Sequence, residues 1–160
     1  MVSLELQLLG IPKVALDGEP VQLDRRASLA LLAYLALTHR AHSRDEIATL
    51  LSGDATVDSA RKRLRNALAD LVEHGLAPFL SISRQSIAFQ QASDDTLDTD
   101  RLDAIISPDR VAPSDAHEWA AERCDWELLA GLSLQDAPDF EIWLAGEREH
   151  RRHQLTIITE

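Results

Sequence analysis

Four basic side chains occur within five positions of the segment DSARKRLRN, at Arg61, Lys62, Arg63 and Arg65. Arginine and lysine bind phosphate oxygens and the edge of guanine, and the next residue, Asn66, has the groups that recognise adenine. This combination predicts a surface that binds a nucleic acid. A solvated helix face with no ligand is the alternative, and the elements around the segment decide between the two.

A helical arrangement separates these basic side chains from the apolar ones. At 100° per residue, Leu64, Leu68 and Leu71 gather on one side of the helix. The opposite side and its two flanks carry the expected contact residues, which are Ser59, Lys62, Arg63, Arg65 and Asn66. Arg61 lies nearer to the apolar side, so we expect it to make a salt bridge or a phosphate contact. The N-terminal half of the helix is therefore expected to face the nucleic acid.

Short strands precede this helix. Apolar and polar residues alternate over residues 4–8 and 14–16, which is the period of a half-buried strand, and residues 20–23 form a third short run. Asp17-Gly18 is a strong signal for a tight turn before the third run. The pattern predicts three antiparallel strands.

Three helices follow the strands. Asp24 is expected to cap the first helix, which runs to about Thr38 and is apolar on nearly every side. Ser43-Arg44-Asp45-Glu46 is a capping box, in which the serine accepts a backbone hydrogen bond and Glu46 reaches back. The third helix, residues 58–73, carries the basic segment and ends near Gly75.

The segment after the helices predicts a β-hairpin. Residues 79–90 alternate in polarity on either side of Ser83-Arg84-Gln85-Ser86, which places Arg84 at the tip for a phosphate or minor-groove contact. Strands, three helices and a final hairpin, in this order, describe an α+β winged helix. Its third helix enters the major groove and its hairpin is the wing. This order favours the nucleic-acid interpretation.

The distribution of charge divides the chain in two. Residues 1–90 hold ten Lys/Arg and ten Asp/Glu, whereas residues 91–160 hold six Arg and seventeen Asp/Glu, so the net charge of -11 lies entirely in the second part. Such asymmetry suggests two domains with different partners. We predict a winged-helix DNA-binding domain at 1–92 and an acidic all-helical domain at 93–160.

The second part is expected to be helical after a linker. Residues 91–99 are polar and acidic, and they predict a linker in which Asp94 and Asp95 are solvated. Helices are expected from residue 100 to 106, from a cap at Ser114 to about Leu132, and from about residue 136 onward. Proline at position 138 suits the first turn of the last helix.

No motif indicates an enzyme or a cofactor. Gly53 and Gly75 stand apart from any phosphate-binding loop, and no Ser/His/Asp arrangement lies on a recognisable nucleophile turn. His150 and His153 lack Cys or acidic partners at metal-ligand spacing, so we interpret them as a solvated helix face. We expect neither a metal nor another cofactor.

Two further features bear on the compartment. The single cysteine, Cys124, excludes an internal disulfide and fits a reducing environment. The most apolar run, residues 27–37, is about half of the roughly 20 residues that a membrane-spanning helix needs, and no basic leader precedes the first strand. The chain is therefore expected to be cytoplasmic and to make no membrane contact.

Three segments resemble one family of bacterial regulators. LQLLGIPKVALDGEPVQLDRRASLALLAYLAL, HSRDEIATLL and DSARKRLRNALADL resemble the N-terminal domain of SARP-like (antibiotic-regulatory-protein type) activators. WELLAGLSLQDAPDFEIWLAGEREHRRHQL is similar to the start of the bacterial transcriptional activation domain that follows it in that family. The chain departs from the family pattern at Ser52, where a tryptophan is usual, and in the neutral charge of its first part.

The resemblance implies both a fold and partners. It implies a winged helix followed by tetratricopeptide-like (TPR-like) helix pairs, with residues 58–73 as the recognition helix and 79–90 as the wing. It also implies binding to double-stranded promoter DNA. The acidic helices are expected to contact RNA polymerase, another protein or a second copy of this chain, so a homodimer is included among the expected states.

Two other functions remain open from the sequence. The neutral charge of residues 1–90 also fits a protein-interaction module whose winged helix does not bind DNA. An accessory domain of a larger signalling ATPase is a third interpretation, because some family members carry nucleotide-binding domains downstream.

Overall fold

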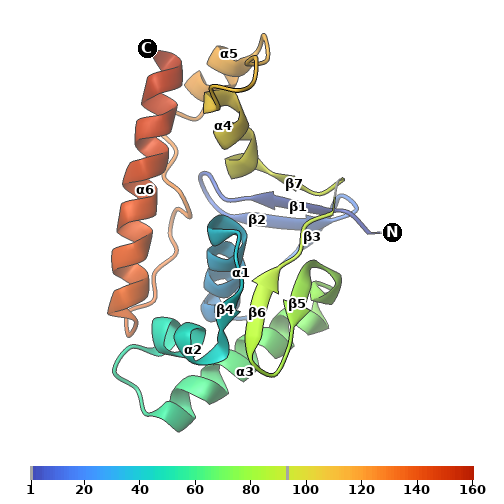
Figure 1. The fold of residues 1–160 in the computed structure, drawn as a ribbon, viewed down its shortest axis with the longest axis vertical. Coiled ribbons are helices and arrows are strands. Elements are labelled where there is room, and N and C mark those ends of the chain that lie inside the picture. The colour runs from blue at the N-terminus through green and yellow to red at the C-terminus, as the bar shows by residue number, and fades with distance from the viewer. Residues whose placement is uncertain (1, 93) are drawn as a thin grey trace. The chain divides into compact units, whose positions relative to one another are not determined.

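The computed structural model describes residues 2–92 and 94–160 and has a mixed α+β fold (Figure 1). These residues form two compact units that are both discontinuous in the sequence. The first unit contains residues 2–20, 94–131 and 144–160, and the second contains residues 21–92 and 132–143. The predicted domains, 1–92 and 93–160, are continuous, and their boundary at residue 93 lies outside the described residues. That division stays a prediction, and the compact units cut the chain differently.

The first unit contains the predicted N-terminal strands. Strand β1 (Leu4–Gln7) pairs antiparallel with β2 (Lys13–Leu16), and β3 (Glu19–Val21) follows at the edge of the sheet. Leu4 and Leu6 are buried while Glu5 is exposed, as the alternation predicts. Asp17 and Gly18 have φ angles of 50° and 82°, which is the positive-φ pair of a tight hairpin turn. The prediction of three strands is confirmed.

The predicted linker at residues 91–99 is wrong over its second half. Strand β7 (Thr96–Leu97) pairs parallel with β1, and α4 (Asp98–Ile106) begins two residues earlier than expected. Asp95, expected to be solvated, is buried and accepts a hydrogen bond from the backbone N–H of Leu4 at 2.9 Å. The backbone groups along the free edge of β1 need partners, and a two-residue strand has no readable polarity pattern. The polar composition of residues 91–99 therefore did not predict β7 and the first residues of α4.

Asp98 holds the start of α4 to the strand. Its carboxylate accepts hydrogen bonds from the backbone N–H groups of Leu8 and Leu9 at 2.9 and 2.8 Å. Burial raises the pKa of Asp98 above its ordinary value of 3.8, although these hydrogen bonds and the positive charge of Arg123 act in the opposite direction.

The predicted helix from Ser114 to Leu132 is also wrong. Helix α5 spans only Ala116–Ala121, and no side-chain cap precedes it. Further along, the chain pairs with the end of β1: the N–H of Leu129 donates to the carbonyl of Leu8 at 2.7 Å, and Leu129 has a φ of 51°. A helix cannot continue through a residue in the left-handed region, so strand-like pairing replaced it here.

Arginines of the first unit are engaged with neighbours inside that unit. Arg151 is buried and forms a salt bridge with Asp103 at 2.6 Å, and Arg148 donates to the carbonyls of Leu128 and Leu129. Arg123 stacks on a tryptophan ring, 4.4 Å from the centroid of Trp119. These contacts leave many carboxylates exposed, among them Asp109, Glu118, Glu122, Asp125 and Glu149.

The second unit is organised around α1 (Arg26–Thr38), in which residues 30–37 are all buried. The expectation of a helix apolar on nearly every side is confirmed. The predicted cap at Asp24 is wrong, because Arg25 occupies the N-cap position and makes no side-chain capping hydrogen bond. Instead, the carboxylate of Asp70, which lies on the third helix, accepts hydrogen bonds from the N–H groups of Asp24 and Arg25 and from the hydroxyl of Ser28.

Two capped helices pack against α1 and each other (Figure 1). Helix α2 (Arg44–Ser52) begins with Ser43, whose hydroxyl accepts from the N–H of Glu46 at 3.0 Å, as predicted. The Glu46 carboxylate, expected to reach back to Ser43, contacts Arg40 and His42 instead. Helix α3 (Val57–Glu73) starts one residue before the predicted position and is capped by Thr56.

A three-stranded sheet completes the second unit. After the short 3-10 turn Ala77–Phe79, β5 (Leu80–Ile82) and β6 (Ser86–Phe89) form the predicted hairpin, and β4 (His42–Ser43) pairs with the other edge of β6. The predicted order of strands, three helices and hairpin is thus present.

The last helix begins where proline predicted it. Helix α6 spans Pro138–Thr159, and its residues are shared between the two compact units. Among the described residues, no helix is both long and apolar enough to span a membrane.

Candidate nucleic-acid interface

Four arginines from three separate elements line one surface groove of 390 Å³ in the second unit. Arg44 comes from the start of α2, Arg61 and Arg65 from α3, and Arg84 from the β5–β6 turn. The remaining lining residues are Ser43, Asp45, Leu64 and Gln85. We call this hollow the arginine groove. It combines guanidinium groups with the N-terminus of a nine-residue helix, and both favour anions.

The groove is assembled by local structure on each side. Arg61 and Arg65 lie four residues apart on α3, so they share one helix face, and the buried Leu64 anchors that face to the core. Across the groove, Arg44 donates from Nε to the carbonyl of Ser83 at 2.8 Å. The backbone N–H of Arg44 also donates to the carbonyl of Gln85 at 3.1 Å, which ties the hairpin turn to α2.

The hairpin turn holds Arg84 outward. The hydroxyl of Ser83 accepts from the N–H of Ser86 at 2.9 Å and from that of Gln85 at 3.2 Å, and the N–H of Ser83 donates to the carbonyl of Ser86. These short-range bonds close the turn and leave Arg84 exposed. A guanidinium held on a closed turn loses less freedom when it binds than one on an open loop.

Two of the six predicted contact residues, Arg65 and Arg84, lie in the arginine groove. Sequence reasoning missed Arg44, although the capping box at Ser43 places it in the first turn of α2 and so next to the helix N-terminus. Arg61 was expected to make a salt bridge or a phosphate contact. Its Nε lies 3.5 Å from a carboxylate oxygen of Asp45, which is the expected salt bridge.

The other four predicted residues lie elsewhere on α3. Ser59 and Arg63 line a second hollow of 630 Å³. Asn66 lines a third hollow, and Lys62 is exposed but lines neither of these nor the groove. The six residues therefore do not form one cluster, because a helix of 17 residues distributes consecutive side chains around its circumference.

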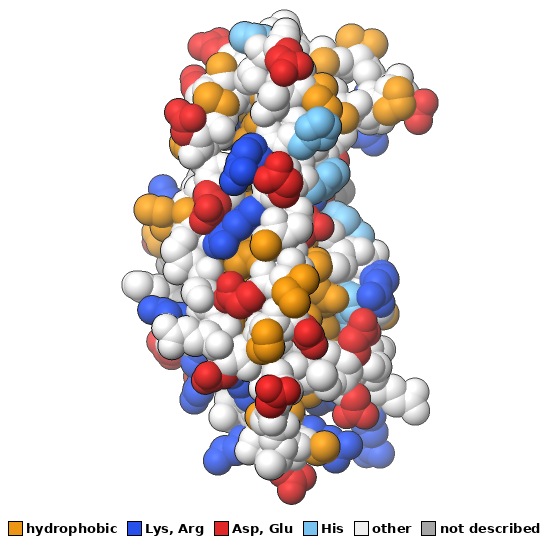
Figure 2. Space-filling view, turned by 90° about the vertical axis from the view of Figure 1, so that its left-hand side faces the viewer, with side chains coloured by type: hydrophobic (Ala, Val, Ile, Leu, Met, Phe, Trp, Pro, Cys, Tyr) orange, Lys and Arg blue, Asp and Glu red, His pale blue; other side chains and the backbone are white. Residues whose placement is uncertain are grey.

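Basic side chains gather at the lower end of the view in Figure 2, where α2 and α3 lie in Figure 1. Acidic and apolar side chains lie among these basic ones in the same view (Figure 2).

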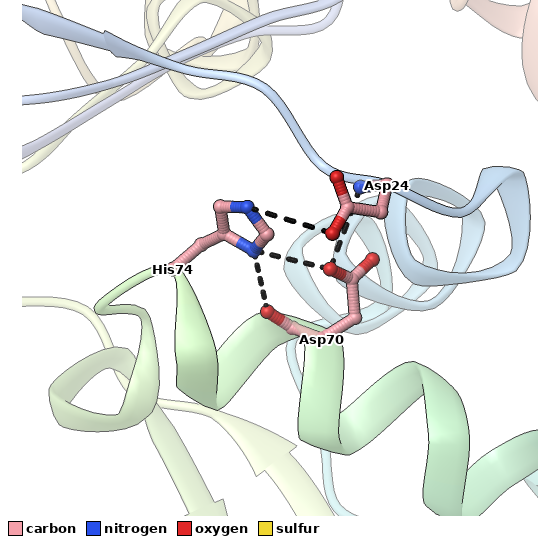
Figure 3. Close-up of side chains that lie close together, drawn as sticks. All are labelled: Asp24, Asp70 and His74. Carbon is pink, nitrogen blue, oxygen red and sulfur yellow. Dashed lines mark hydrogen bonds and ion pairs between the residues drawn. The ribbon is translucent and has the colours of Figure 1, made fainter.

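A polar cluster fixes the C-terminal end of α3. His74 follows the last turn of α3, and its Nδ1 lies 2.8 Å from the carbonyl and 3.0 Å from the carboxylate of Asp70 (Figure 3). Its Nε2 lies 4.0 Å from the Asp24 carboxylate. These groups include ligand types that metals use, but Asp70 already accepts from Ser28 and two backbone amides. The contacts are accounted for by a link between α3 and the start of α1.

The pKa values of Asp70 and His74 are both shifted toward the charged form. Burial acts to raise the pKa of Asp70, but the hydrogen bonds from Ser28, Asp24 and Arg25 outweigh it and hold the pKa below its ordinary value of 3.8. The hydrogen bond to the Asp70 carbonyl, together with the negative charges of Asp70, Asp24 and Glu73, raises the pKa of His74 above 6.5. Protonated His74 and ionised Asp70 therefore stabilise each other.

The pKa of a second histidine, His42, is shifted in the opposite direction. His42 is fully buried, its Nε2 lies 2.7 Å from the Thr38 hydroxyl, and its Nδ1 lies 3.3 Å from the Glu46 carboxylate. Because a carboxylate can only accept, Nδ1 carries a proton in the contact with Glu46. Burial, and then the charge of Arg40, lower the pKa of His42 below 6.5.

Replacing His74 by glutamine should remove part of the fall in the free energy of unfolding that occurs as the pH rises above 6.5. A raised pKa means that His74 stabilises the folded state fully below pH 6.5 and that this contribution is lost as the pH rises through its folded pKa. His42, with its lowered pKa, instead removes stability as the pH falls below 6.5. Urea unfolding of wild type and H74Q between pH 5 and 9 measures this. We expect parallel acid limbs and a flatter alkaline limb in H74Q; parallel alkaline limbs would show that the His74 contacts contribute nothing.

The fold is similar to a solved structure. The chain resembles Mycobacterium tuberculosis EmbR, whose structure was solved in complex with a low-affinity phosphopeptide, with a TM-score of 0.67 and 20% sequence identity. The similarity covers 96% of this chain and 44% of the EmbR chain, so this chain spans less than half of EmbR. No protein-family model and no curated protein matches the sequence significantly. At this identity the likeness shows the fold alone.

Proposed function

We propose that this chain is a DNA-binding regulator of transcription that holds the phosphate backbone of promoter DNA in the arginine groove. The observation that carries the proposal is the convergence of Arg44, Arg61, Arg65 and Arg84 on one groove from three elements. Phosphate contacts supply most of the affinity of a DNA-binding protein and fix its orientation on the duplex. The SARP-like fold is consistent with this role.

Within the proposal, the second unit acts as a winged helix. Helix α3 is the recognition helix in the major groove, and the β5–β6 hairpin is the wing. Lys62 is exposed on α3 and suits a guanine edge or a phosphate, and Asn66 suits adenine. Ser59 and Arg63, on another side of α3, complete the proposed contacts with phosphates at the N-terminal end of the helix.

The acidic residues beyond position 93 are proposed to contact protein rather than DNA. Their exposed carboxylates repel phosphate, while Arg148 and Arg151 among them are engaged with neighbours in the same unit. We propose that this part is TPR-like and contacts RNA polymerase, another protein or a second copy of the chain.

A second candidate is a protein-interaction module that does not bind DNA. The balanced charge of residues 1–90 favours it, and the EmbR structure contains a phosphopeptide. A groove with four arginines also fits a phosphorylated segment of a protein. This candidate predicts a partner complex that forms without DNA and persists at high salt.

Fluorescence anisotropy with promoter DNA separates the two candidates. We expect the chain to bind duplex DNA from its own upstream region, with a log–log salt slope of about −3 to −4 between roughly 50 and 300 mM salt, since each neutralised phosphate contributes about −0.9. Addition of RNA polymerase to the complex should give a further rise in anisotropy. Absence of DNA binding even at 50 mM salt would overturn the proposal and leave the interaction module.

A further inference from the structure

The arginine groove contains one carboxylate whose charge opposes its proposed ligand. Among the described residues that line the groove, Asp45 is the acidic one, and it lies with four arginines. Its Oδ1 is 3.5 Å from the Nε of Arg61. A phosphate that approaches Arg61 must therefore compete with Asp45.

The fold does not need this carboxylate. The Asp45 side chain is 77% exposed and that of Arg61 is 55% exposed, and an ion pair so open to water adds little to stability. Ser43 caps α2, and Glu46 places a second carboxylate in the same first turn, so the helix N-terminus keeps a favourable charge without Asp45.

A carboxylate in this place acts most strongly on sequence-independent binding. Non-specific affinity comes from backbone phosphates alone, so a negative charge in the groove weakens it at every DNA site. At the correct site, base contacts from α3 are added, and they offset the loss of the Asp45–Arg61 pair. The charge therefore keeps binding to phosphates alone weak, while base contacts supply the affinity at the correct site.

We propose that Asp45 restrains non-specific binding: it holds Arg61 away from phosphates and so suppresses binding to DNA of arbitrary sequence. This inference rests on the proposed DNA-binding function. It predicts that the removal of one negative charge strengthens binding to random DNA and adds about one phosphate contact.

The test compares D45N with D139N on a random-sequence duplex of about 25 base pairs, by anisotropy from roughly 50 to 200 mM salt. Asp139 is also exposed and lies in the first turn of a helix, α6, but does not line the groove, so D139N changes the net charge equally. We expect D45N to bind about threefold to tenfold more tightly at 50 mM salt, with a slope steeper by about 0.9, and D139N to change affinity less than twofold.

A double-mutant cycle locates the effect at Arg61. R61Q should abolish most of the gain in D45N, because Asp45 then has no guanidinium to withhold. Equal affinities of D45N and D139N would overturn the inference while the function stands. Weaker binding by D45N would also overturn it and would indicate that Asp45 accepts a hydrogen bond from a base. If wild type and both variants fail to bind at 50 mM salt, the proposed function falls and this inference falls with it.

Discussion

Replacing Arg65 and Arg84 together by glutamine should weaken binding to duplex DNA by about tenfold to a hundredfold at 50 mM salt. Both side chains line the arginine groove, one from α3 and one from the hairpin turn, and each is exposed. A hydrogen bond that stays open to water contributes a net of roughly 0.5–1.5 kcal/mol, so two contribute about 1–3 kcal/mol, and about 1.4 kcal/mol corresponds to a tenfold change in affinity. The loss of two phosphate contacts should also make the log–log salt slope shallower by about 2 × 0.9, or roughly 1.8.

The control for this prediction changes the same number of charges outside the groove. Arg110 and Arg152 are exposed residues of the first unit, and the variant R110Q/R152Q lowers the net charge by the same amount. We expect it to bind DNA with nearly wild-type affinity and slope. Equal losses in both double variants would attribute binding to net charge, and no loss in R65Q/R84Q would exclude the groove as the interface. Circular dichroism melting of each variant separates a binding defect from unfolding.

Replacing Gly53 by alanine should lower the free energy of unfolding by about 2–4 kcal/mol. Gly53 ends α2 with φ 56° and ψ −120°, a backbone conformation that side chains rarely adopt and that costs on the order of 1–3 kcal/mol. A Cβ atom at this position would lie 2.5 Å from the carbonyl oxygen of Asp136 and 2.9 Å from Cδ of Pro138. The turn between α2 and α3 would therefore have to move away from the segment that leads into α6.

The matched control is the glycine in the interior of α6. A Cβ atom at Gly146 meets no atom within 4 Å, so G146A should raise the free energy of unfolding by roughly 0.5–1 kcal/mol through the better helix propensity of alanine. Urea unfolding of the two variants beside wild type measures both effects. A wild-type midpoint for G53A would contradict the close packing of residues 136–138 on the α2–α3 turn.

The sequence predicts only part of the arginine groove and nothing of the need for glycine at position 53. The basic segment of α3 is visible in the sequence, but the partners of Arg65 in the groove are not. Arg44 and Arg84 are separated by 40 positions and come together because β4 pairs with β6 and the Arg44 backbone bonds to the hairpin turn. Gly53 shows no local signal beyond a turn, because its requirement for glycine comes from Asp136 and Pro138, far along the chain.

The sequence by itself determined the elements whose cause is local. Alternating Leu4, Leu6 and Leu8, the Asp17-Gly18 turn, the Ser43 cap and Pro138 at the start of α6 each act through neighbouring residues, and the structure contains each of them. Hydrophobic periodicity and turn chemistry are short-range, so one sequence suffices to read them.

Only the tertiary structure decided the contacts whose partners are remote. The start of α1 is bonded by Asp70 from α3 and not by Asp24, residues 96–97 are a strand because the edge of β1 is adjacent, and the chain near Leu129 pairs with Leu8 instead of continuing a helix. In each case a backbone group needed a hydrogen-bond partner, and closeness in space, rather than in sequence, selected that partner. The same reason explains why the arginine groove could not be predicted as a groove: its four guanidinium groups are brought together by packing and pairing between separate elements.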